Sequence, residues 1–107
     1  MSGFSASWLA LREAADHRSR DIRLAGKLAA FLASRGTQRL VDIGCGTGSN
    51  LRALAPHLGA RQDWRLVDYD PSLLAAARAA LADWADRAVS AGDGQEGDLV
   101  LTKGDRT

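Results

Sequence analysis

The spacing of apolar residues along the chain changes between the period of a helix and short continuous runs. Apolar residues recur three or four positions apart, as on one face of a helix, in segments 4–15, 21–35, 51–58 and 74–84. Mostly apolar runs replace this spacing at 40–43 and at 64–67. Such runs are typical of strands, and the first predicts a strand that is buried. The pattern therefore predicts helices that alternate with strands.

Two helices are expected before the first strand. The second should run from about Asp21 to Arg35, and Gly36 suits the left-handed residue that commonly ends a helix. The residues expected to be buried are Phe4, Trp8, Leu11 and Ala15 in the first helix and Leu24, Leu28, Phe31 and Leu32 in the second.

Residues that start or stop helices mark the later elements. Ser49 suits the cap of the helix after the first strand, and Pro56 should kink that helix or mark its last turn. Asp70 followed by Pro71 is a good start for the next helix, which the glycines at 92–94 should break. The expected buried face of this later helix consists of Leu74, Ala77, Leu81 and Trp84.

The segment GDLVLTKGDRT, residues 97–107, predicts a third strand that runs into a turn at Lys103–Asp105. The same turn also suits a hairpin whose return arm is missing. We favour the hairpin and leave Asp105 out of the candidate site. Strands that alternate with helices imply parallel pairing and right-handed crossovers. The expected fold class is therefore α/β, with a parallel sheet and flanking helices.

Length, charge and cysteine content exclude several classes of protein. The 107 residues fit one domain, with leading helices over 1–36 and the start of a core over 37–107. A net charge of +1 with scattered signs gives no basic surface for nucleic acid. Cys45 is the single cysteine, and no cysteines and histidines have metal-ligand spacing, so neither a disulfide nor a metal site is expected. No segment is apolar enough for a leader or a membrane span, and we expect a cytoplasmic protein.

The stretch RLVDIGCGTGSNL, residues 39–51, places Gly44, Gly46 and Gly48 between a strand and a helix. Such turns let a ligand approach the backbone and its N–H groups closely. The dinucleotide pattern GxGxxG would need a glycine at Ser49. Asp42 would repel a pyrophosphate but suits the ammonium of S-adenosylmethionine, whose carboxylate can accept from N–H groups of the turn. The stretch therefore favours S-adenosylmethionine over a dinucleotide.

A second acid, Asp68, ends the second strand 20 residues after Gly48. A carboxylate there can accept hydrogen bonds from both hydroxyls of a ribose, which either ligand has. Tyr69 follows it and can pack against an adenine ring. Cys45 lies inside the glycine turn, where a small side chain filling a tight space is a better interpretation than a nucleophile.

With these residues in place, the chain resembles the first half of a class I S-adenosylmethionine-dependent methyltransferase. The family pattern of acid, x, Gly, x, Gly, x, Gly matches Asp42, Gly44, Gly46 and Gly48, and the ribose-binding acid of the family falls on Asp68. The resemblance covers roughly 39–81. It implies a Rossmann-like sheet, S-adenosylmethionine as cofactor, and transfer of a methyl group to an acceptor that the sequence does not identify. No catalytic residue is assigned.

The resemblance also implies a seven-stranded sheet, of which this chain supplies two secure strands and a doubtful third. We therefore expect a fragment, truncated after the second or third strand, that binds the cofactor weakly or folds poorly alone. A missing C-terminal half or a partner chain would cover the bare edge of the strand at 40–43.

Two other functions stay open from the sequence. A nicotinamide-dependent oxidoreductase would use Ser49 in place of the third glycine, and a non-catalytic module would keep only the fold.

The role of the first helix also stays open. The stripe Arg12, Asp16 and Arg20 is interpreted as a solvated face, whereas in related methyltransferases such leading helices often cover the cofactor.

Overall fold

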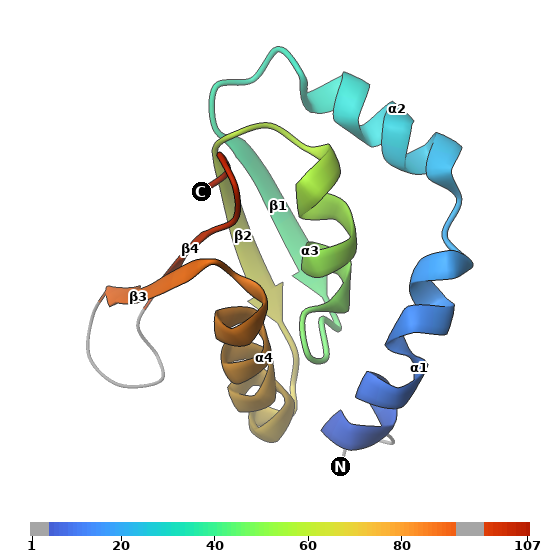
Figure 1. Ribbon diagram of the computed structural model, residues 1–107, viewed down its shortest axis with the longest axis vertical. Coiled ribbons are helices and arrows are strands. Elements are labelled where there is room, and N and C mark those ends of the chain that lie inside the picture. The colour runs from blue at the N-terminus through green and yellow to red at the C-terminus, as the bar shows by residue number, and fades with distance from the viewer. Residues whose placement is uncertain (1–4, 92–97) are drawn as a thin grey trace.

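A computed structural model describes residues 5–91 and 98–107. Figure 1 shows helices gathered around a short central sheet, with a hairpin beside it. The elements in chain order are α1 (Ala6–Arg18), α2 (Ile22–Leu32), β1 (Gln38–Ile43), α3 (Ser49–Leu54), the single 3-10 turn η1 (Ala55–His57), β2 (Gln62–Val67), α4 (Pro71–Trp84), β3 (Arg87–Ala91) and β4 (Asp98–Thr102).

The central sheet consists of β1 and β2, which pair in parallel. The register runs from Gln38 opposite Gln62 to Ile43 opposite Val67, so both strands end at the same edge of the sheet. The connection through α3 returns the chain to the starting edge, as parallel pairing requires. The expected α/β class, with a parallel sheet and flanking helices, is confirmed.

The core lies on one face of this sheet. Leu51, Ala55 and Leu81, from α3, η1 and α4, are buried together against inward-facing side chains of β2. Side chains alternate between the two faces of a strand, so neighbouring positions of β1 point away from these helices. The prediction of a buried strand was therefore wrong for Val41 and Ile43, and Ile43 is 82% exposed. Helices cover one face of the sheet, and a strand buried on both faces needs two covered faces.

The strand expected within 97–107 is present as β4, and it belongs to an antiparallel hairpin, as favoured from the sequence, rather than to the parallel sheet. β3 pairs with β4 from Arg87 opposite Thr102 to Ala91 opposite Asp98. β3 was not predicted, because the helix that begins after Asp70 was expected to continue to the glycines at 92–94. Those glycines lie outside the described residues. The turn at Lys103–Asp105 is present, but the hairpin partner precedes β4 along the chain.

The leading helices form, but their expected buried faces were mostly wrong. α1 has no buried residue, and Leu11 is 85% exposed. Phe4 lies outside the described residues. On α2, Leu32 is buried while Leu24 and Phe31 are exposed, because this helix meets η1 near its own end rather than along its length.

The predicted helix ends were partly correct. Asp70 caps α4 by accepting from the N–H of Ser72, and Pro71 follows it, as predicted. Pro56 lies in the 3-10 turn that ends α3, as predicted. Gly48 rather than Ser49 caps α3. α2 ends at Leu32, and Gly36 does not adopt the left-handed conformation.

The one-sided core makes a direct prediction for two leucines of equal size. Leu81→Ala removes side-chain atoms from a site that is 4% exposed, and should lower the free energy of unfolding by about 2–5 kcal/mol. Leu11→Ala alters an exposed position of α1 and should change the free energy of unfolding by less than about 0.5 kcal/mol. Urea unfolding followed by circular dichroism measures both. Equal losses would contradict this placement of the core.

Candidate functional site

The turn between β1 and α3 takes its shape from three glycines. Gly44, Gly46 and Gly48 have φ angles of 73°, 56° and 85°, which residues with a Cβ rarely adopt. At Gly48 an added Cβ would also lie 3.2 Å from a methyl carbon of Leu81. At Gly44 it would meet nothing within 4 Å. The turn is therefore packed against α4 at one end and open at the other.

The N–H groups of this turn are largely used within the protein. Those of Gly44 and Cys45 donate to the carbonyl of Val67, at 2.7 and 3.0 Å, and that of Gly46 donates to the carboxylate of Asp68 at 3.0 Å. The sequence analysis assigned turn N–H groups to a ligand carboxylate, and these three already have partners. The bonds instead fix the turn to the end of β2, so the glycines act mainly through shape.

Asp42 lies buried near the end of β1 with one oxygen unpartnered. Its Oδ1 accepts from the side-chain amide of Asn50 at 3.0 Å, whereas Oδ2 is buried and has no partner among the described residues. A buried carboxylate oxygen without a donor is costly, because it has lost its water. A ligand ammonium would supply the missing donor. The residues present therefore fit the amino group of S-adenosylmethionine.

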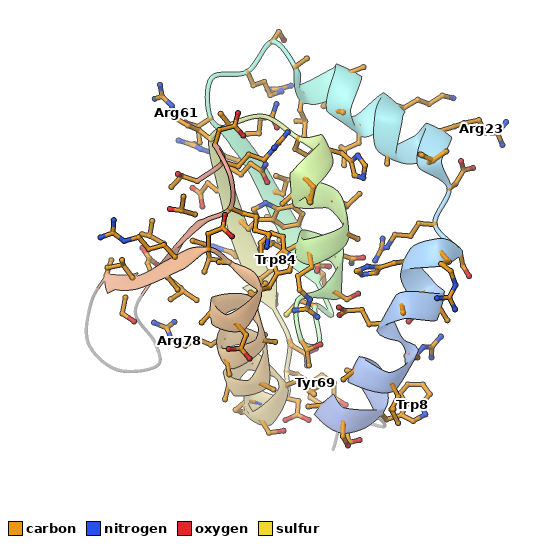
Figure 2. All side chains as sticks on the ribbon, viewed as in Figure 1. Trp8, Arg23, Arg61, Tyr69, Arg78 and Trp84 are labelled. Atoms are coloured by element: carbon orange, nitrogen blue, oxygen red, sulfur yellow. The ribbon has the colours of Figure 1, made fainter. Side chains whose placement is uncertain are left out.

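Asp68 and Tyr69 follow β2 on the other side of the turn. Asp68 is half-buried. Its Oδ1 accepts a hydrogen bond from the N–H of Asp70 at 2.9 Å, and its Oδ2 accepts one from the N–H of Gly46. Each oxygen has a second lone pair, so both can also accept from a ribose hydroxyl. Tyr69 is exposed, at the end of the molecule where α1 begins (Figure 2). The structure thus brings Asp42, the glycines and Asp68 together, with Tyr69 beside them.

Cys45 is buried within the turn, between the two acids. Loss of water and the charges of Asp42 and Asp68 raise the pKa of its thiol from 9.0 to about 11. The thiol donates to the carbonyl of Gly46 at 3.6 Å. A thiol with this pKa is a weak nucleophile at neutral pH, which agrees with a space-filling role.

Sequence analysis missed the contacts that α1 makes with this turn. Glu13 forms an ion pair with Arg52 of α3, and His17 shares a hydrogen bond of 3.1 Å with Ser49. Arg20 donates to the amide oxygen of Asn50. Glu13 and His17 are polar residues at helical spacing, which was the available signal. The stripe Arg12, Asp16 and Arg20 was interpreted as a solvated face; Arg12 and Asp16 do pair with each other in solvent, whereas Arg20 contacts Asn50.

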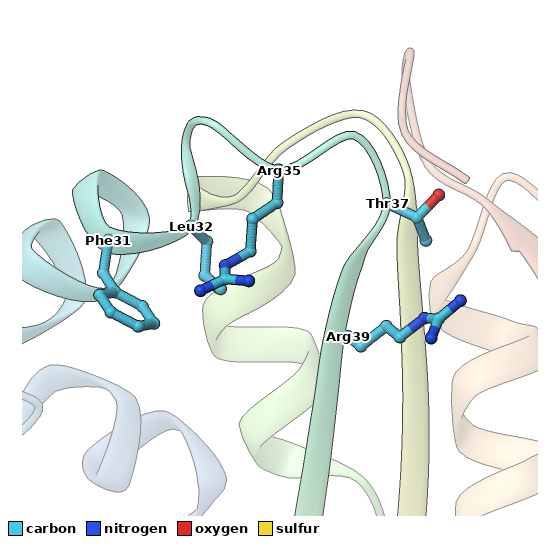
Figure 3. Close-up of a pocket in the computed structure, with 5 residues that line it drawn as sticks. All are labelled: Phe31, Leu32, Arg35, Thr37 and Arg39. Atoms are coloured by element: carbon cyan, nitrogen blue, oxygen red, sulfur yellow. The ribbon is translucent and has the colours of Figure 1, made fainter.

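Two hollows border α2 and β1. One, of about 440 Å³, is lined by Phe31, Leu32, Arg35, Thr37 and Arg39 at the start of β1 (Figure 3), far from the glycine turn. The other, of about 450 Å³, is largely apolar but includes Asp42 and Asn50 among its lining residues. The second hollow therefore adjoins the candidate site, and the first does not.

Within residues 5–91 and 98–107, no helix is long and apolar enough to cross a bilayer. Nor do three or more His, Cys, Asp or Glu side chains come together there in a way that would hold a metal ion.

The raised pKa of Cys45 predicts slow alkylation of the folded chain. At pH 8 the folded thiol should react with iodoacetamide about 100-fold more slowly than the thiol of the chain in urea, because its thiolate fraction is smaller. Because the pKa of the thiol is higher in the folded chain, its protonation stabilises the folded state. This stabilisation is complete below pH 9.0 and is lost as the pH rises through about 11. Mass spectrometry of the alkylated chain measures the rate. Equal rates in the two states would contradict a buried, protonated thiol.

Comparison with known proteins agrees with this geometry. A family model described as a methyltransferase domain matches residues 41–105, which include the whole glycine turn and Asp68. The biotin biosynthesis bifunctional protein BioCD of Bordetella avium (strain 197N) is 50% identical over 58 residues. That match covers 54% of this chain and 12% of the relative. No solved structure matches. The chain belongs to the methyltransferase-domain family, within the class I S-adenosylmethionine-dependent methyltransferases.

Proposed function

We propose that this chain is the cofactor-binding portion of a methyltransferase that transfers the methyl group of S-adenosylmethionine to an acceptor. The single observation that carries the proposal is the buried, unpartnered Oδ2 of Asp42 beside an open glycine turn. A dinucleotide would bring a pyrophosphate toward that negative charge, which disfavours the oxidoreductase alternative. An ammonium would give the charge its missing partner.

Each remaining site residue has a role in this proposal. Gly44 leaves room for the ligand, while Gly46 and Gly48 bend the backbone away from it. Asp68 accepts from the ribose hydroxyls, and Tyr69 packs against the adenine. Cys45 fills the space beneath the turn, between the two carboxylates.

The chemistry requires little of these side chains beyond binding and orientation. The cofactor, when bound, supplies a methyl group on a positively charged sulfur, which a nucleophilic atom of the acceptor attacks in line. The residues of this chain would hold that methyl group in a fixed direction, and positioning of this kind is a large part of catalysis in such reactions. No side chain of the site is assigned as an acid or a base.

Three further observations support proposals on the acceptor, the compartment and the missing neighbours of the chain. The relative is named for biotin biosynthesis, so we propose that the acceptor belongs to that pathway. The single cysteine favours action in the reducing cytoplasm. Further strands of a longer domain would pair with the open edge of β1, and further helices or a partner chain would cover Val41 and Ile43 on the open face.

A binding titration with S-adenosylmethionine tests the proposal. The chain should bind the cofactor saturably in isothermal titration calorimetry and should not bind NADH. Asp42→Asn removes the charge that meets the ammonium and should weaken binding by about 10- to 100-fold. Asp63→Asn, on the exposed face of the same sheet, is the matched control and should leave the affinity unchanged.

Two results would contradict the proposal. One is the absence of saturable binding of S-adenosylmethionine, whether or not NADH binds. The other is equal affinity in Asp42→Asn and Asp63→Asn, with both variants folded by circular dichroism.

A further inference from the structure

Two polar side chains of α1 and one just after it make hydrogen bonds to the start of α3. Glu13 and His17 lie four residues apart and share a face of the helix, whereas Arg20 follows two residues after the helix ends at Arg18. Their partners are Arg52, Ser49 and Asn50. We call these three contacts the α1 clasp. Figure 1 shows α1 running beside α3 and the glycine turn.

Arg52 connects the clasp to the glycine turn. Its side chain is 8% exposed, which is unusual for an arginine. Its Nη1 donates to the carbonyl of Thr47 at 2.6 Å, and the rest of the guanidinium pairs with Glu13. Thr47 is buried between Gly46 and Gly48. Nη2 also donates to the hydroxyl of Thr47 at 3.4 Å, so the guanidinium bonds both the middle of the turn and α1.

A buried guanidinium depends strongly on its carboxylate. Without Glu13 the charge of Arg52 would be left buried and only partly hydrogen-bonded, which is much less favourable than the loss of an exposed pair. Arg52 also holds the pKa of Glu13 below its ordinary value of 4.5, so the carboxylate is ionised at neutral pH. Arg12 and Asp16, on the same helix, are 48% and 42% exposed and form the contrasting solvent pair.

The other end of the clasp leads to the same site. Arg20 donates to Asn50, whose amide nitrogen in turn donates to Asp42. A methyl carbon of Leu9 lies 3.4 Å from where a Cβ on Gly46 would be. α1 therefore contacts the turn through Leu9, and Arg20, just after the helix, contacts the partner of Asp42, although α1 has no buried residue of its own.

We propose that Glu13 is a positioning residue that acts through Arg52 to couple the docking of α1 to the shape of the glycine turn. Docked α1 holds Arg52 in place, and Arg52 holds the carbonyl of Thr47 between two of the glycines that shape the turn. Loss of Glu13 frees both α1 and the turn. The cofactor part of this inference rests on the proposed function, whereas the coupling of helix and turn does not.

Hydrogen exchange of the unliganded chain tests the coupling. In Glu13→Gln the amide of Gly48, which donates to the carbonyl of Cys45, should exchange at least about tenfold faster than in the unchanged chain. Asp16→Asn, the matched control, should change no amide of the turn. Glu13→Asp keeps the charge with a shorter reach and should give an intermediate rate.

Titration with S-adenosylmethionine tests the route through Arg52. Glu13→Gln should weaken binding by about tenfold, whereas in an Arg52→Met background the same substitution should have almost no further effect. Asp16→Asn should bind like the unchanged chain. If the unchanged chain binds no S-adenosylmethionine, the proposed function fails, and hydrogen exchange alone still decides whether Glu13 holds the turn.

Three results would overturn the inference. The first is an exchange rate of Gly48 that is equal in Glu13→Gln and Asp16→Asn. The second is a tenfold weakening of S-adenosylmethionine binding by Glu13→Gln in the Arg52→Met background. The third is faster exchange throughout the core of Glu13→Gln, at Leu81 as well as at Gly48, because that would show a general loss of stability.

Discussion

The parallel pairing of β1 and β2 is the constraint on which the rest of the structure depends. Parallel strands need a crossover, and α3 supplies it on one face of the sheet. The register ends both strands together, so the acid near the end of β1 and the acid after β2 meet at one edge. The glycine turn then fits between them, tied to β2 through the carbonyl of Val67 and the carboxylate of Asp68.

The same arrangement explains why the molecule has one covered face. α3, η1 and α4 lie on the face where Leu51, Ala55 and Leu81 gather. Val41 and Ile43 point the other way and stay exposed. An exposed apolar sheet face of this kind is typical of a surface that another element covers. The match to the BioCD relative covers 12% of the length of that protein.

The sequence predicted the parts that depend on local chemistry. Backbone conformation and helix capping can be predicted from neighbouring residues. They account for the alternate glycines next to Asp42 and for the helix start at Asp70–Pro71. The burial of Leu11 and Val41 was predicted wrongly because burial depends on what packs against a face, and periodicity does not contain that information. β3 was missed because Arg87–Ala91 has only weak alternation and pairs with residues that follow it.

The site was predicted in the same uneven way. Asp42 and Asp68 followed from motif spacing, and the structure brings them to one turn, although their ligand contacts stay predictions. The role of Glu13 was not readable, because its partner Arg52 is 39 positions away and no local pattern joins them. Ion pairs between distant elements follow from the fold, so they enter an analysis only after the fold is known.

The lack of buried residues on α1 has a thermodynamic consequence of its own. When a helix of this kind detaches, it exposes little apolar surface, so the opening has a small heat capacity change and a small denaturant dependence. The chain should therefore have two separate stabilities, a cooperative one for the sheet and its helices and a shallow one for α1. Temperature and urea would act mainly on the first, while the charge state of the pair formed by Glu13 and Arg52 would control the second.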